Sequence, residues 1–175
     1  MNIRSIWILS IAFTLLIGTA LVGCGKGGSG SDANEALFEA AKAGNLEAAK
    51  KAIAAGADVK AHAAGSSEMG DQGHTALHYA AERGYNEVVQ FLLDSGADIE
   101  AKNGFGNTPL LLAINFTMTD TVMLLLKKGA DIKAKNSIGK GAIAHARKGR
   151  PSDKTLDLLA KVEAAGAPPE PESGK

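Results

Sequence analysis

The apolar positions of this chain form short helical stripes that recur at a fixed interval. Residues 73–102 align without a gap with residues 106–135, thirty-three positions later. In the first of these segments Leu77, Ala80 and Ala81 share one side of a short helix, and a longer apolar stripe follows over 88–93. One such unit cannot bury its own apolar side, so the pattern predicts a solenoid of stacked helical pairs.

Four units of this kind are predicted along the chain. They occupy residues 33–61, 73–101, 106–134 and 139–167. The first and last are the most polar and irregular, as expected of units that cap a solenoid at its ends. An inserted loop over 62–72 separates the first two units, and such insertions often lie on a binding face. A tolerated loop without a function explains the insertion equally well.

Helix boundaries follow from local side-chain chemistry. Thr75 and Thr108 are expected to cap the start of the first helix in their units, and Pro109 fits the first helical turn, where its missing N–H is not needed. Glycine tolerates the left-handed conformation that ends many helices. The glycines expected in this role are Gly84, Gly96 and Gly129.

This pattern resembles the ankyrin repeat. The residues that match its first consensus element are Gly73, Thr75, Leu77, His78, Ala80, Ala81 and Gly84, and those that match its second are Leu92, Leu93, Gly96, Ala97 and Asp98. The resemblance implies an all-α solenoid of about four helix–loop–helix units with β-turn fingers along one edge. It also implies that the His78 imidazole forms a structural hydrogen bond with nearby backbone. The alternative is that His78 acts as a ligand or as a base. In the third unit Thr117 stands where the family has glycine.

The N-terminal segment 1–23 has a basic start followed by an apolar run, which is typical of a secretory signal. The run ends in Leu21-Val22-Gly23-Cys24, which resembles the lipobox of bacterial lipoproteins. The resemblance implies cleavage before Cys24 and lipidation of its thiol; an uncleaved anchor helix is the alternative. We expect a flexible Gly/Ser tether over 24–32 and a disordered tail over 168–175.

These features predict a lipid-anchored protein of the bacterial envelope, with its domain in the periplasm. Gly25, which follows the cysteine where an aspartate could stand, favours the outer membrane by analogy with enteric sorting rules. Cys24 is the sole cysteine, so neither an intrachain disulfide nor a catalytic thiol is available in the domain.

Charge is distributed unevenly although the total is near zero. Residues 32–100 hold 5 Lys/Arg and 12 Asp/Glu, a balance of −7, whereas residues 101–150 hold 9 and 2, a balance of +7. The basic half could steer an acidic partner, or these charges could simply be solvated surface. No base-reading motif accompanies the charge, so nucleic acid is not an expected partner.

The sequence carries no motif for catalysis or for a nucleotide cofactor. The side chains that could gather a zinc ion are His62, Glu68, Asp71 and His74, but their spacing matches no named site. We therefore predict no enzyme activity, no cofactor and no metal.

A monomer that binds another protein through its fingers and inner helices is the leading hypothesis. The candidate contacts in the first finger are His62, Ser66, Glu68, Met69, Asp71 and His74. The candidates in the later fingers are Phe105, Asn107, Ile138 and Lys140, and those on the first helices are Tyr79 and Leu112. The alternative is an immunity-type lipoprotein that neutralises a toxin or effector enzyme in the periplasm.

Overall fold

A computed structural model describes residues 30–64, 73–148, 157 and 160 of the chain. This part holds seven helices and no strand, which confirms the all-α prediction. The helices are α2 (Gly30–Ala43), α3 (Leu46–Ala54), α4 (Ala76–Arg83), α5 (Asn86–Asp94), α6 (Pro109–Asn115), α7 (Thr119–Lys127) and α8 (Ala142–Lys148).

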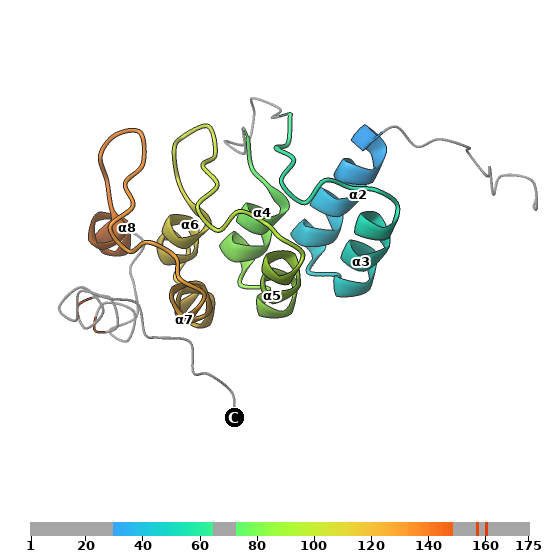
Figure 1. Cartoon of the computed structure of the whole chain (residues 1–175). Helices are drawn as coiled ribbons and strands as arrows, with labels where there is room; N and C mark the ends of the chain where they lie inside the picture. The colour runs from blue at the N-terminus through green and yellow to red at the C-terminus, as the bar shows by residue number, and fades with distance from the viewer. Residues whose placement is uncertain (1–29, 65–72, 149–156, 158–159, 161–175) are drawn as a thin grey trace, which may run out of the picture.

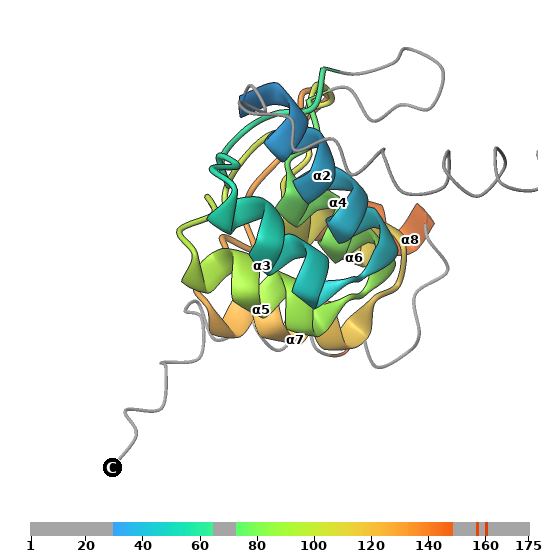
Figure 2. The same ribbon diagram turned by 90° about the vertical axis from the view of Figure 1, so that its right-hand side faces the viewer.

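The helices form two rows that run along the stack. α2, α4, α6 and α8 make one row, α3, α5 and α7 make the other, and the connecting loops rise along one edge beside the first row (Figure 1). Figure 2 views the stack from the end that carries α2 and α3. Each helix packs mainly on the partner in its own unit and on the matching helix of the next unit, as a solenoid requires.

The core lies between the rows and between successive units. Its largest fully buried aliphatic side chains are Leu37, Leu77, Val88, Val89, Leu92, Leu110, Leu111, Ile114, Leu125 and Leu126. Small alanines such as Ala80 and Ala113 are also fully buried, so the helices can approach one another closely. In α6 every residue from Pro109 to Ile114 is buried, because α4 and α8 cover it on both sides.

The helix starts follow the predicted capping chemistry. Thr108 adopts an extended backbone, and its hydroxyl accepts the N–H of Leu111 at 3.4 Å, with Pro109 in the first turn. Thr75 occupies the same position before α4. At the other end of α4, Gly84 is left-handed with φ +77°.

Glycine at the end of the first helix is needed for two reasons. Gly44 has φ +68°, and a Cβ placed there would lie 2.7 Å from the ring of Tyr85 in the next unit. A Cβ on Gly84 would lie 2.7 Å from Sδ of Met118, again one unit further on. The backbone conformation and the close packing of the next unit therefore both exclude a side chain.

The structure corrects one predicted boundary, and several other predicted segments lie outside the described residues. Helix α2 begins at Gly30, with Asp32 in its first turn, so residues 30–32 belong to the first helix and not to the tether. The signal segment 1–23, the start of the tether, most of the loop 62–72, most of the last unit beyond 148 and the tail 168–175 lie outside the described residues. Within the described residues no helix is both long and apolar enough to cross a membrane.

Thr117 provides a test of the glycine argument, because it adopts φ +61° at the position of Gly44 and Gly84. A β-branched residue is disfavoured in this left-handed region. We expect Thr117→Gly to raise the free energy of unfolding by about 1 kcal/mol, less the entropy that glycine adds to the unfolded chain. Urea unfolding followed by circular dichroism measures the change. Thr117→Ala keeps the Cβ and should give no comparable gain; an equal gain would assign the effect to the lost hydroxyl.

Candidate functional site between the second and third fingers

The second finger, residues 102–107, is folded by the side chain of Asn103. Its Oδ1 accepts the N–H of Phe105 at 3.0 Å and that of Asn107 at 2.9 Å. The backbone also closes on itself, since the N–H of Asn103 donates to the Asn107 carbonyl at 3.1 Å. This turn places the Phe105 side chain outside the core, with 51% of its surface exposed.

The third finger, residues 135–140, repeats this turn thirty-three positions later. Asn136 Oδ1 accepts the N–H groups of Ile138 at 3.2 Å and Lys140 at 2.9 Å. Its Nδ2 donates to Asn107 Oδ1 at 3.0 Å and lies 3.2 Å from His145 Nε2. Asn136 therefore ties the third finger both to the second finger and to helix α8.

The two fingers also contact each other through the backbone. The N–H of Ser137 donates to the carbonyl of Phe105 at 3.0 Å. Gly106 has φ +72°, and a Cβ there would lie 2.6 Å from the nitrogen of Ser137, so the fingers touch where no side chain fits. The spacing between the fingers is therefore fixed by main-chain contacts.

A pocket of about 320 Å³ lies between these fingers, the end of α6 and the first turn of α8. The residues that line it are Gly104, Phe105, Asn107, Asn115, Asn136, Ser137, Ile138, Lys140, Ala144 and His145. The structure thus brings together four of the predicted contact residues, namely Phe105, Asn107, Ile138 and Lys140. Phe105 and Ile138 are exposed, the latter to 72%, and contribute apolar surface to a site that also contains three asparagine amides.

The predicted contacts at the first finger have different environments. His62 is exposed, and its Nδ1 donates to the carbonyl of Gly73 at 2.7 Å, which helps to close the base of the finger. His74 is only 4% exposed and stacks on Tyr79 with ring centroids 5.1 Å apart. The candidates Ser66, Glu68, Met69 and Asp71 lie outside the described residues.

Tyr79 and Leu112 are buried and do not present the open groove surface predicted for them. Tyr79 is 4% exposed, because it packs beside Phe38 of α2 and under Lys42, whose Nζ lies 4.7 Å from the ring centroid. Leu112 is 6% exposed. As candidate contact residues these two were predicted incorrectly, because the stacking of neighbouring units buries their positions on the first helices.

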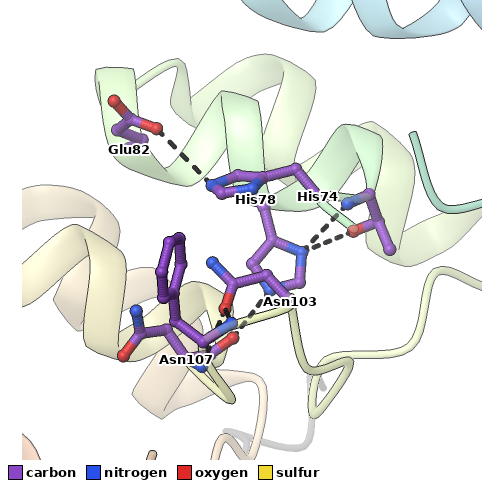
Figure 3. Close-up of polar contacts among 7 residues, drawn as sticks. His74, His78, Glu82, Asn103 and Asn107 are labelled. Carbon is purple, nitrogen blue, oxygen red and sulfur yellow. Dashed lines mark hydrogen bonds and ion pairs between the residues drawn. The ribbon is translucent and has the colours of Figure 1, made fainter. Parts of the chain in front are cut away.

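His78 connects two units through its imidazole (Figure 3). The ring is fully buried; Nδ1 accepts the N–H of Thr75 at 3.1 Å and lies 2.9 Å from its hydroxyl oxygen, while Nε2 lies 2.9 Å from the carbonyl of Asn107. A carbonyl only accepts, so the proton belongs on Nε2 and the ring is neutral. Burial lowers the pKa of His78 to about 4, against the opposing effect of the Asn107 carbonyl.

The sequence analysis missed Asn115, Asn136 and His145 as parts of the site. The repeat itself carries a signal for Asn136, because it follows Asn103 at the thirty-three-residue period. For His145 the sequence indicates only a shifted position relative to His78, and its contact with Asn136 becomes visible in three dimensions.

No group of three or more His, Cys, Asp or Glu side chains is placed to hold a metal ion in the part of the chain that the structure describes. Of the four side chains considered for zinc, Glu68 and Asp71 lie outside that part.

Stacked helical pairs with a row of fingers define the chain as a repeat solenoid of the protein-interaction class. Residues 12–103 and 37–136 match the family model described as ankyrin repeats (3 copies), which together is more than half of the chain. The protein belongs to the ankyrin repeat family. Its repeats are a protein-interaction module, generally without enzymatic activity.

Several characterised proteins are similar over part of this chain. Protein phosphatase 1 regulatory subunit 27 of Homo sapiens is 36% identical over 74 residues, which is 42% of this chain and 44% of the relative. Ankyrin repeat domain-containing protein 40 of Mus musculus is 37% identical over 78 residues, 45% of this chain and 20% of the relative. A transient receptor potential cation channel subfamily A member 1 homolog of Caenorhabditis elegans is 47% identical over 45 residues, 26% of this chain and 4% of the relative. The chain therefore spans less than half the length of each.

The lowered pKa of His78 predicts that stability depends on pH. The pKa of His78 is about 4 in the folded protein, against an ordinary value of 6.5. Between these two pH values the unfolded chain therefore binds more protons than the folded one. The contribution of His78 is therefore complete above pH 6.5 and is lost as the pH falls toward about 4. We expect it to be worth about 3 kcal/mol at most across this window.

The measurement compares urea unfolding of the wild type and of His78→Leu, which takes the residue found at Leu111 in the next unit. The variant should be less stable at neutral pH and should lose less stability on acidification. Equal losses in the two proteins would show that His78 does not couple folding to pH.

Proposed function

We propose that this protein is a non-enzymatic, lipid-anchored binding module of the bacterial cell envelope. Its ankyrin domain binds another protein in the periplasm, through the fingers and the adjoining row of helices α2, α4, α6 and α8. The lipid on Cys24 holds it to a membrane, with the outer membrane favoured by Gly25. The ankyrin family, in which repeats serve protein interaction, supports the binding role.

The observation that carries the proposal is the pocket between the second and third fingers. Phe105 and Ile138 expose large apolar side chains there, although such side chains are generally withdrawn from water. Apolar anchors surrounded by polar groups are the usual centre of a protein interface. The main-chain contact between the fingers holds these anchors in place before any partner arrives.

The first experiment captures partners from an envelope fraction of the native organism. The bait is the chain from residue 24 with Cys24→Ser, so that it stays soluble. We expect at least one protein to bind the wild-type domain and to be lost or weakened at least about tenfold by the pair Phe105→Ser and Ile138→Ser.

Met123→Ser is the matched control, because Met123 is 52% exposed but lies on α7 in the other row of helices. It removes a comparable exposed apolar side chain without altering the fingers. A partner lost equally in the control and in the finger variant would not be bound at the fingers. Equal melting temperatures of the three proteins verify that only the surface has changed.

The anchor is tested separately by labelling growing cells with radioactive palmitate. The full-length wild type should incorporate label and sediment with membranes, whereas Cys24→Ser should not incorporate label, because Cys24 is the sole thiol of the chain. Detergent separation of the inner and outer membranes then tests the sorting prediction. A wild type that sediments with membranes without incorporating label would favour an uncleaved anchor helix.

A further inference from the structure

The fingers that form the pocket, residues 102–107 and 135–140, carry lysines and contain no Asp or Glu of their own. Lys102, Lys135 and Lys140 are exposed, and residues 101–119 and 132–148 contain no Asp or Glu. Among the described residues none of these three lysines forms an ion pair. By contrast Lys42 pairs with Glu39, Lys50 with Glu47 and Lys128 with Asp94. Lys135 and Lys140 are therefore available to a partner, whereas Lys102 interacts electrostatically with Glu100.

The matching position one unit earlier shows why the pocket lacks a carboxylate. Asn115 stands thirty-three residues after Glu82, whose Oε2 lies 3.9 Å from His74 Nε2. The replacement puts a neutral amide at the end of α6. The Asn115 side chain is half-buried and makes no hydrogen bond within the described part of the chain. It offers both a donor and an acceptor to a bound chain.

The same comparison shows why this site is hollow. Ala144 of the fourth unit corresponds to Leu111 of the third, which is fully buried. Likewise Asn107 of the third unit corresponds to His74 of the second. Two smaller side chains leave space that larger ones occupy one unit earlier. At about 320 Å³ the pocket lies at the low end of the range for ligand sites, which suits one or two side chains and not a whole domain.

We propose that this pocket recognises a segment of a partner protein in which an apolar side chain stands beside Asp or Glu. The inference rests on the proposed function and specifies its partner. The apolar side chain enters between Phe105 and Ile138, a carboxylate meets the Nζ of Lys140, and the Asn115 amide pairs with the backbone of the segment. Lys102 and Lys135 lie on the flanks of the fingers and extend the attraction for acidic neighbours.

The test uses a random peptide library displayed on phage and selected on the soluble chain with Cys24→Ser. Selected sequences should be enriched in Asp or Glu next to a branched aliphatic or aromatic residue. The best of them, made as a labelled peptide, should bind with an affinity that falls as salt rises. It should also shift the NMR signals of Gly104, Asn115 and Ser137.

Matched variants separate the pocket from general charge attraction. Lys140→Glu and Ile138→Ser should each weaken binding of the labelled peptide about fivefold to tenfold. Lys127→Glu makes the same charge change on α7, outside the pocket, and should leave the affinity nearly unchanged. A single-stranded oligonucleotide of equal negative charge should bind more weakly than the peptide, because it cannot place an apolar side chain between the fingers.

Several results would overturn the proposal. These are enrichment of basic or neutral sequences, absence of any enriched sequence, equal effects of Lys140→Glu and Lys127→Glu, or equal binding of the oligonucleotide. The capture experiment distinguishes this failure from failure of the proposed function. A captured partner that needs Phe105 and Ile138 but tolerates Lys140→Glu leaves the binding role intact and refutes only the acidic partner.

Discussion

Burial between neighbouring units is the constraint on which the rest of this structure depends. The helices of a unit are too short and too narrowly apolar to be stable alone. Leu77 and Leu111 become fully buried only because matching helices stack on both sides. The close approach demanded by that stacking explains the buried alanines and the left-handed glycines on which Tyr85 and Met118 rest.

Polar groups that cross from unit to unit set the register of the stack. The His78 imidazole reaches the Asn107 carbonyl, and the Asn107 side chain accepts from Asn136, which in turn contacts His145. These groups are buried or half-buried, so a slipped register would leave several of them without partners. The network ends at the fingers and therefore fixes the shape of the pocket as well as that of the core.

Much of the fold could be predicted from the sequence because its determinants are local and repeat. The caps at Thr75 and Thr108 and the glycine at Gly84 act within one turn of a helix. The exposure of Tyr79 was predicted incorrectly, because its burial depends on Phe38 and Lys42 in the preceding unit. At the site, Phe105 and Ile138 were found from their finger positions, whereas Asn115 and His145 join them only through the packing of α6 and α8.

The residues that differ from those at matching positions of the preceding units identify the pocket between the fingers better than the repeated residues do. Where the solenoid keeps its large side chains, Leu111 and His74 are buried beneath the fingers. Where Ala144 and Asn107 replace them, a pocket opens, and the change from Glu82 to Asn115 removes its negative charge. Each replacement sacrifices packing or a polar contact that the neighbouring unit retains. Because three such changes converge on one pocket that also gathers Phe105, Ile138 and Lys140, recognition of a partner accounts for them better than stability does.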